Sequence, residues 1–466
     1  MFLPILSAIL GIIAFLPINF YPAGLVFLAP LFIFFLREQK LRRLILGTAL
    51  FRLTFGLGTV YYTLEPIFWL TSLLIFFGLP ISIWLIKKFS ARFHSLFVIR
   101  YLLFIALPFL WTVFDLLQAR YSLLPTYIIT AGNSLGSSPF VGLAGIGGLV
   151  LLTFFAASIN TLIAATIAAP PLTREEKKRG FILIGVIAIL IFSAYFISQY
   201  RLQKNASEYD NLPNSLKIAA ISTNEKFERG QFEKLKAELS GKQLDLIVFP
   251  EDIFSSRADL FDSQREFFQN LAKELNADII TVFDTISEGK KYNSAILFGK
   301  NGEIAGVHNK NRLTFIGEYW PFGDWRLSFY DWLAKKNPKI KNYAVFDIKN
   351  AYARGDTNML KIKEANFAAA ICLEIQYLFD IKKYRENSAR FVVNPTSNRW
   401  IGKGAKHFLY ISDNLKKIEA VWLKLPIVSG GVKDFAGIIL PDGEAYFVNY
   451  ENSPKDWGMF FGEIKY

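Results

Sequence analysis

Seven long apolar runs occupy the first 200 residues of this 466-residue chain. They cover residues 3–19, 22–36, 44–64, 67–86, 96–118, 144–169 and 181–198. A helix needs about 20 mainly apolar residues to cross a bilayer, so the runs predict a polytopic α-helical membrane domain with about seven spans. The first run has neither a charged segment before it nor a small-x-small cleavage site after it. We therefore interpret it as a retained helix and not a signal peptide.

The pattern changes near residue 217 to short apolar strands that alternate with amphipathic helices, which predicts an α/β fold. The predicted strands are Lys217–Ser222, Leu244–Phe249, Asp278–Asp284, Ser294–Phe298, Ile304–Val307, Phe367–Ile371 and Phe391–Asn394. The predicted helices are Gln231–Leu239, Gln264–Leu275 and His407–Leu425. Asn301-Gly302 and Asp442-Gly443 predict hairpin turns. We therefore predict two domains, a transmembrane domain of residues 1–200 and an α/β domain of residues 201–466.

Charge is distributed unevenly between these halves and predicts their topology. Residues 1–200 hold 14 Lys/Arg and 5 Asp/Glu, whereas residues 201–466 hold 38 and 34. The basic residues of the first half gather in alternate loops, at 37–43, 87–92 and 174–179. The positive-inside rule then places the N-terminus in the cytoplasm, and an odd number of spans delivers the second domain outside the cytoplasm. Basic residues in short loops set the orientation of membrane spans, so we expect no nucleic-acid partner despite the net charge of +13.

A few isolated charges lie in or beside the apolar runs: Arg52, Glu65, Arg100, Asp115 and Arg120. Proton and solute pathways usually place such groups in the middle of a span. Because these residues lie mostly near the ends of runs, we expect them to anchor the helices at the membrane interface.

The counts of cysteine and histidine exclude several classes of site. Cys372 is the only cysteine, so the chain has no intrachain disulfide framework. His94, His308 and His407 are far apart and show no metal-ligand spacing. No P-loop or dinucleotide-binding pattern is present. We expect neither a metal nor a cofactor.

Three chemically useful residues follow predicted strands of the α/β domain. Glu251 follows Leu244–Pro250, Cys372 follows Phe367–Ile371, and Lys310 follows the second strand of the Asn301-Gly302 hairpin. Each alone has an ordinary explanation: a solvated loop residue, a buried small hydrophobe or a surface lysine. Loops at strand carboxyl ends, however, are where α/β folds gather catalytic groups.

Together the three residues suit covalent catalysis. A cysteine nucleophile needs a base to take its proton, and a partly desolvated carboxylate serves for this. The oxyanion formed by attack on a carbonyl needs a cation or N–H donors, which Lys310 and the backbone amide of Leu373 supply.

These residues and their surroundings resemble the nitrilase (carbon–nitrogen hydrolase) superfamily. More narrowly, the chain resembles the apolipoprotein N-acyltransferase family, the membrane branch of that superfamily. The matching motifs are Phe249-Pro-Glu-Asp252, the segment Asn309–Pro321, Ile371-Cys-Leu-Glu374 and Asn394-Pro-Thr-Ser-Asn-Arg-Trp400. Each motif is weak alone, but the four occur in the family's order behind the apolar runs.

The resemblance implies an αββα sandwich with Glu251 as general base, Lys310 as oxyanion stabiliser and Cys372 as nucleophile. It also implies that Glu318 and Glu374 are additional active-site carboxylates. Two departures concern the acceptor: Leu373 replaces the tyrosine common after the nucleophile, and Ser429–Ala436 replaces an asparagine-rich segment.

The function that the resemblance implies is acyl transfer at a bacterial inner membrane. Cys372 would take a fatty acyl chain from a membrane phospholipid as a thioester and pass it to the N-terminal amine of a diacylglyceryl-cysteine lipoprotein. We expect the protein to act as a monomer. The alternatives are a membrane-tethered nitrilase-type amidase or hydrolase, in which water replaces the amine, and a non-catalytic scaffold or transporter. The complete triad argues against a scaffold, and the scarcity of mid-span charges argues against a transporter.

Overall fold

A computed structural model describes residues 1–59, 66–90, 96–123, 127–168, 174–227, 229–253, 261–336, 338–399, 401, 405–449, 451 and 455–466. These residues form two compact units that are not consecutive in sequence. The first comprises Met1–Glu208, Ile401–Lys424 and Leu440–Glu444, and the second comprises Tyr209–Trp400, Leu425–Ile439 and Ala445–Tyr466. Helix α13 (Ala405–Leu423) therefore belongs to the first unit, where it packs against α7.

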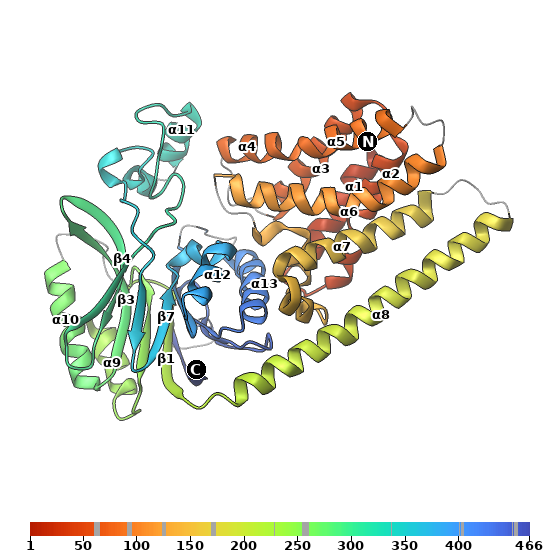
Figure 1. Cartoon of the computed structure of the whole chain (residues 1–466). Coiled ribbons are helices and arrows are strands. Elements are labelled where there is room, and N and C mark those ends of the chain that lie inside the picture. Colours follow the sequence, from red (N-terminus) through yellow and green to blue (C-terminus); the bar gives the residue numbers. More distant parts are fainter. Residues whose placement is uncertain are drawn as a thin grey trace. The chain divides into compact units, whose positions relative to one another are not determined.

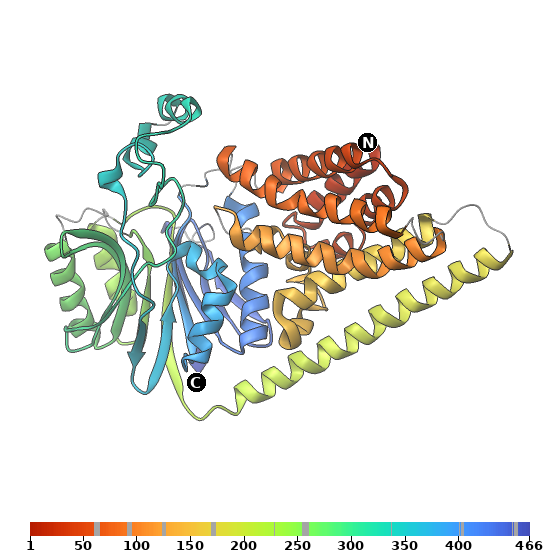
Figure 2. The ribbon, with the colours of Figure 1, turned by 45° about the horizontal axis from the view of Figure 1, so that its top comes forward.

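The first unit is helical, and helical segments occur in each of the seven apolar runs. Its helices are α1 (Phe2–Ala14), α2 (Ala29–Arg37), α3 (Leu41–Thr59), α4 (Pro66–Phe76), α5 (Gly78–Ser90), α6 (Leu96–Tyr121), α7 (Ala144–Ala168) and α8 (Arg174–Asp210). Both views show α8 as a single long rod (Figures 1 and 2).

Four helical stretches among the described residues are long and apolar enough to cross a membrane. They are Leu70–Ser90, Leu102–Tyr121, Val141–Ala168 and Ile182–Asp210. The apolar helices Phe2–Ala14 and Tyr21–Arg37 are shorter than a spanning helix needs. Helix α3 has sufficient length but carries Arg42, Arg43 and Arg52. The number of seven spans is thus not confirmed.

Buried polar side chains hold the helices of the first unit together. The Oδ1 atom of Asn160 accepts hydrogen bonds from the backbone N–H groups of Leu28 (2.7 Å) and Ala29 (3.0 Å), at the start of α2. At the other end of α2, the Nζ atom of Lys87 donates to the carbonyl of Glu38 (2.6 Å). Both contacts satisfy backbone groups that a helix end leaves without an intrahelical partner.

Two of the isolated charges do not anchor the helices at an interface, and our prediction for them is wrong. Arg52 and Asp115 are each only 1% exposed. Arg52 donates a hydrogen bond to Gln118, and Asp115 accepts one from the backbone N–H of Ala131 at 2.8 Å. Partners distant in sequence explain this burial, because a charge is buried at tolerable cost only when it is paired or hydrogen-bonded. Glu65 and the side chain of Arg100 lie outside the described residues.

The second unit is built on one sheet, whose described part has twelve strands. Nine lie in the order β5-β4-β3-β2-β1-β9-β8-β7-β6, β12 pairs with β1, and β10 and β11 extend from β9. The strands are β1 (Ser215–Thr223), β2 (Leu246–Glu251), β3 (Asp278–Ser287), β4 (Lys290–Phe298), β5 (Ile304–Asn309), β6 (Met359–Ile362), β7 (Ala365–Ala369), β8 (Phe391–Ser397), β9 (Ile427–Val432), β10 (Ala436–Ile439), β11 (Ala445–Val448) and β12 (Trp457–Lys465). All seven predicted strands are present, as are both predicted hairpins, β4–β5 and β10–β11.

Strand β1 divides this sheet into two halves. It pairs in parallel with β2 through residues 218–220 and with β9 only through its last two residues, Ser222 and Thr223. The adjacent strands β2, β1, β9, β8 and β7 run parallel, so the carboxyl ends of β2, β7 and β8 lie at the same edge. This arrangement brings the ends of distant segments together, as parallel α/β sheets do.

Helices cover this sheet through an apolar core. Helices α9 (Arg229–Leu239) and α10 (Phe261–Leu275) lie along the half formed by β1–β4 (Figure 1). Aromatic rings fill the interface: Phe268 of α10 packs on Phe249 of β2 (5.2 Å between centroids) and on Phe298 of β4 (5.9 Å). Helix α12 (Leu378–Glu386) packs against β7. The segment after β5 leaves the sheet and carries α11 (Ser328–Lys336), which stands apart from the strands in both views (Figures 1 and 2).

Candidate active site

Glu251 is the last residue of β2 and lies at the carboxyl edge of the parallel strands. Its side chain is almost buried, with the residue 8% exposed. The amide of Asn293 in β4 donates a hydrogen bond of 2.9 Å to Oε1 of Glu251 and another of 2.9 Å to Oε1 of Glu318. One amide group therefore holds two carboxylates side by side.

Lys310 lies directly after β5, opposite these carboxylates. Its backbone N–H bonds to the carbonyl of Asn293 at 2.8 Å, which extends the β4–β5 pairing by one residue and fixes its position. The Nζ atom is 2.9 Å from Oε1 of Glu318 and 3.6 Å from Oε1 of Glu251, and the residue is 1% exposed. Glu318 is thus the closer partner of Lys310, and its other oxygen accepts the N–H of Thr314 at 2.7 Å.

Cys372 begins a short 3-10 turn, η10 (Cys372–Gln376), soon after β7. Its φ of +51° is a left-handed conformation, which costs a non-glycine residue free energy and is common where a catalytic side chain must be aimed. The thiol hydrogen-bonds with Glu251 and with the backbone N–H of Ser397. The N–H of Leu373 follows in the first turn of η10, where helical geometry leaves amides free of intrahelical partners.

The electrostatics of these four side chains are shaped by burial and by mutual charge. Burial raises the pKa of Glu251, and Lys310 only partly offsets the effect. Burial alone would lower the pKa of Lys310, but Glu318 and Glu251 outweigh it and raise that pKa. Burial would raise the pKa of Glu318, but Lys310 and the Thr314 amide lower it. Burial and then the charge of Glu251 raise the pKa of the Cys372 thiol.

These pKa shifts give each group a distinct protonation state at neutral pH. Lys310 stays charged beside an ionised Glu318, so a cation is always present for an oxyanion. Cys372 stays a thiol until a base takes its proton, and the raised pKa of Glu251 strengthens that carboxylate as the base. The site is therefore arranged for nucleophilic attack with proton transfer from Cys372 to Glu251.

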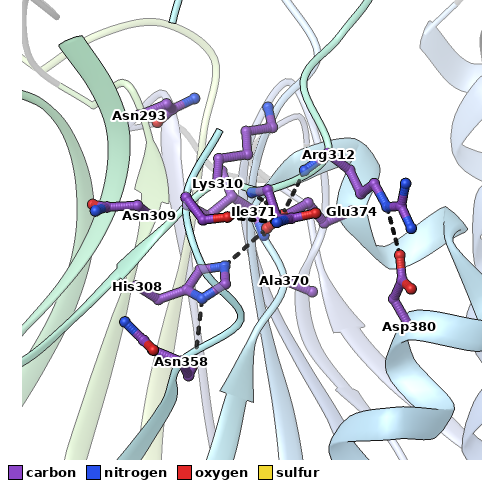
Figure 3. A network of polar contacts seen from close by, with 12 residues as sticks. Asn293, His308, Asn309, Lys310, Arg312, Asn358, Ala370, Ile371, Glu374 and Asp380 are labelled. Atoms are coloured by element: carbon purple, nitrogen blue, oxygen red, sulfur yellow. Dashed lines mark hydrogen bonds and ion pairs between the residues drawn. The ribbon is translucent and has the colours of Figure 1, made fainter. Parts of the chain in front are cut away.

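Glu374, the remaining predicted carboxylate, does not join this cluster but links the two chain segments that carry it. Its Oε2 atom accepts the N–H of Ile371 (2.9 Å), and its Oε1 atom accepts the N–H groups of Asn311 (2.7 Å) and Arg312 (3.1 Å). The Nε2 atom of the buried His308 lies 3.2 Å from Oε2 (Figure 3). Glu374 therefore fixes the Cys372 turn to the segment that follows Lys310.

We expect Glu374→Ala to reduce both stability and activity. The substitution leaves three backbone N–H groups without their acceptor, and each unmade buried hydrogen bond costs about 1–3 kcal/mol. A stability loss of about 3 kcal/mol or more and a fall in kcat of about 100-fold should follow, measured by thermal unfolding in detergent and by acyl transfer. The exposed Glu364, which pairs with Lys361 at 3.4 Å, supplies the control Glu364→Ala. Equal effects of the two substitutions would contradict this role.

The structure thus brings together Glu251, Lys310, Glu318 and Cys372, with the Leu373 amide beside the nucleophile. It also adds two residues that the sequence analysis missed. Asn293 bridges the carboxylates, and its only sequence signal is a polar residue directly before the predicted strand Ser294–Phe298. His308 was considered only as a metal ligand, and its contact with Glu374 spans 66 residues. Trp400, the last residue of the fourth motif, lies outside the described residues.

Comparison with known proteins finds relatives over most of the chain. The family model described as the apolipoprotein N-acyltransferase N-terminal domain matches residues 7–162, and the carbon-nitrogen hydrolase model matches residues 204–414. The apolipoprotein N-acyltransferase of Wigglesworthia glossinidia brevipalpis is 22% identical over 463 residues, which is 93% of this chain and 86% of that protein. Over most of its length this chain is similar to the apolipoprotein N-acyltransferase family. The Haemophilus influenzae member is 23% identical and aligns over 91% of this chain and 81% of its own length.

Two solved structures similar to this chain are described as a member of the nitrilase superfamily and as a carbon-nitrogen hydrolase. Saccharomyces cerevisiae Nit3 has a TM-score of 0.41 and 13% identity, and it covers 55% of this chain and 91% of its own. A carbon-nitrogen hydrolase from Helicobacter pylori G27 has a TM-score of 0.40 and 14% identity, with 54% and 89% covered.

Proposed function

We propose that this protein is a membrane acyltransferase that moves a fatty acyl chain from a phospholipid to the N-terminal amine of a diacylglyceryl-cysteine lipoprotein. Lipoprotein N-acylation is the activity that gives its family its name, and both family domains are present in order. The observation that carries the mechanism is the convergence of Glu251, Lys310 and Cys372, because one cluster holds the base, the cation and the nucleophile.

In the first half-reaction, Glu251 takes the Cys372 proton as Sγ attacks the ester carbonyl carbon of the donor. The oxygen of the tetrahedral intermediate takes up negative charge, which Lys310 and the Leu373 amide stabilise. The C–O bond to glycerol then breaks, and Glu251 returns its proton to the leaving alkoxide. The products are a Cys372 thioester and a lysophospholipid, with Glu251 again ionised.

In the second half-reaction, the amine of the acceptor attacks the thioester carbonyl. Glu251 takes a proton from the attacking nitrogen, and the same groups stabilise the second oxyanion. The C–S bond breaks, the amide forms, and the proton passes from Glu251 to Cys372. The roles given to Glu251, Lys310, Cys372 and the Leu373 amide are part of this proposal. So is the ping-pong order, in which the lysophospholipid leaves before the acceptor amine attacks.

We further propose that all seven helical regions insert in the membrane, with the N-terminus in the cytoplasm and the catalytic domain of residues 201–466 outside it. The four long apolar helices and the loop-charge alternation support this topology. It suits the chemistry, since donor and acceptor both remain anchored in the bilayer. A reporter fused after residue 201 should behave as extracytoplasmic, and cytoplasmic behaviour would contradict the topology.

The pH dependence of acylation should reflect the raised pKa of Glu251. A general base works only when ionised, so kcat/KM should fall as pH falls through that pKa, at a higher pH than the ordinary glutamate value of 4.5. The Asn293 hydrogen bond lowers the pKa of Glu251, so Asn293→Ala should move the acidic limb to still higher pH. A limb that stays in place or moves to lower pH would show that Glu251 is not the titrating base.

The transfer itself is tested by mass spectrometry of a synthetic diacylated lipopeptide incubated with the purified protein and phospholipid vesicles. The expected product gains one acyl chain at its α-amino group, with an equivalent of lysophospholipid formed. Release of free fatty acid with an unmodified lipopeptide would instead indicate the hydrolase alternative.

A further inference from the structure

We propose that Lys226 and Arg399 form a binding site for the phosphate group of the acyl donor, beside Glu251. This inference rests on the proposed function, because it specifies how the phospholipid is recognised. A lipid headgroup and free inorganic phosphate both present phosphate oxygens to the two cations, so binding is measured with both.

The two cations meet at one carboxylate. Lys226 lies in the loop after β1, Arg399 follows β8, and Asp252 comes directly after Glu251. The Nζ atom of Lys226 is 2.9 Å from Oδ1 of Asp252, and the guanidinium of Arg399 pairs with Oδ2. The side chains of Lys226 and Arg399 are 32% and 27% exposed, so both are partly desolvated but reachable from solvent.

The two cations of this cluster lie close enough to repel each other. Two cations share Asp252, and the nearby Glu225 pairs with Lys433 at 2.9 Å. Burial, followed by the charge of Arg399, lowers the pKa of Lys226 to about 8. The Nε atom of Arg399 is buried and donates no hydrogen bond to any described residue. A bound anion would relieve the repulsion between the two cations.

The position of the cluster suits a donor whose ester is attacked by Cys372. Arg399 lies two residues after Ser397, whose N–H bonds to the Cys372 thiol. Burial lowers the pKa of Arg399, and the charges of Glu225 and then Glu251 partly offset this lowering. The ester and the phosphate of a phospholipid are attached to the same glycerol, so they must bind close to each other. Lys226 also lines a surface pocket, whose other residues are Asn224, Glu225, Phe227, Gln231 and Asp456.

Phosphate fits these two side chains chemically. Guanidinium groups bind phosphate oxygens through paired N–H donors, and an ammonium adds a point charge. Charge-assisted hydrogen bonds contribute about 1.5–3 kcal/mol each, which corresponds to about tenfold or more in affinity. Asp252 competes with the phosphate for the same cations, so its carboxylate should weaken binding.

Binding to the Cys372→Ala protein tests the site without relying on catalysis. The probe is a soluble short-chain phosphatidylethanolamine, titrated calorimetrically beside a diacylglycerol of the same chain length and inorganic phosphate. Arg399→Gln should weaken phospholipid binding about tenfold and leave diacylglycerol binding unchanged. Asp252→Asn should tighten phospholipid binding, and asparagine tolerates the φ of +60° at this position. Arg385→Gln, in α12, is the matched control and should have no effect.

A phosphate site predicts that the two substitutions change phospholipid affinity in opposite directions. A purely structural ion pair predicts that both substitutions weaken binding. Loss of binding in Asp252→Asn, or no change in Arg399→Gln, would overturn the inference. Tight binding of inorganic phosphate alone, without preference for phospholipid over diacylglycerol, would also overturn it. Binding is measured in Cys372→Ala and does not depend on turnover. If this variant binds phospholipid as expected but the wild-type protein transfers no acyl chain, the proposed function is contradicted and the phosphate site is still supported.

Discussion

Replacing Cys372 with alanine is expected to abolish acyl transfer, with a loss of at least about 10⁴-fold in kcat. In the proposed mechanism the thiol is the group that forms the covalent intermediate, and removal of a nucleophile leaves only binding and oxyanion stabilisation. Alanine has the same backbone demands as cysteine at the φ of +51°, so the fold should be retained. The measurement is single-turnover acylation by phospholipid, followed by mass spectrometry.

Stability supplies the control for this experiment. The thermal midpoint of Cys372→Ala should stay close to that of the wild-type protein, and Cys372→Ser should retain the fold while reacting far more slowly, since a hydroxyl is a weaker nucleophile. Near-normal turnover by Cys372→Ala would rule out Cys372 as the nucleophile.

Lys310→Met should cause the second large loss, of about 100-fold or more in kcat. In the proposed mechanism Lys310 is the cation at the oxyanion, and in the structure it is also the partner of two buried carboxylates. Its removal leaves Glu251 and Glu318 joined only through Asn293. Removing one partner of a buried ion pair typically costs about 3–5 kcal/mol, so the free energy of unfolding should fall as well.

A double substitution separates the two roles of Lys310. Lys310→Met with Glu318→Gln removes the cation and one of its buried carboxylates, so it should recover much of the lost stability without recovering activity. The exposed Lys361 provides the control Lys361→Met, which should change stability by no more than about 0.5 kcal/mol. Recovery of activity in the double variant would show that Lys310 is only structural.

The strands and turns of the second unit could be predicted because their signals are local. Alternating or continuous apolar residues bounded by turns gave seven strands, and Asn301-Gly302 and Asp442-Gly443 gave two hairpins, whose glycines have φ of +81° and +83°. Strands β6, β9, β10, β11 and β12 were not predicted. Two of them, β9 and β12, pair with β1, which lies far away in sequence, and nothing in their own residues indicates this partner.

Other features depended on tertiary contacts that composition does not contain. The proximity of Glu251, Lys310 and Cys372 was inferred from their positions at strand ends and from the family resemblance. The linking role of Glu374 follows from four hydrogen-bond partners in two segments, His308–Arg312 and Ile371, which no motif describes. Arg52 and Asp115 were misplaced because their position in an apolar run does not indicate whether a side chain faces lipid or other helices.

The most direct test of the central claim is the mass of the intact protein after incubation with phospholipid alone. The account predicts a gain of one fatty acyl chain on Cys372, removed by neutral hydroxylamine, absent in Cys372→Ala, and discharged to a triacylated product when a diacylated lipopeptide is added. Continuous release of free fatty acid without acceptor, or no gain in mass at all, would contradict it.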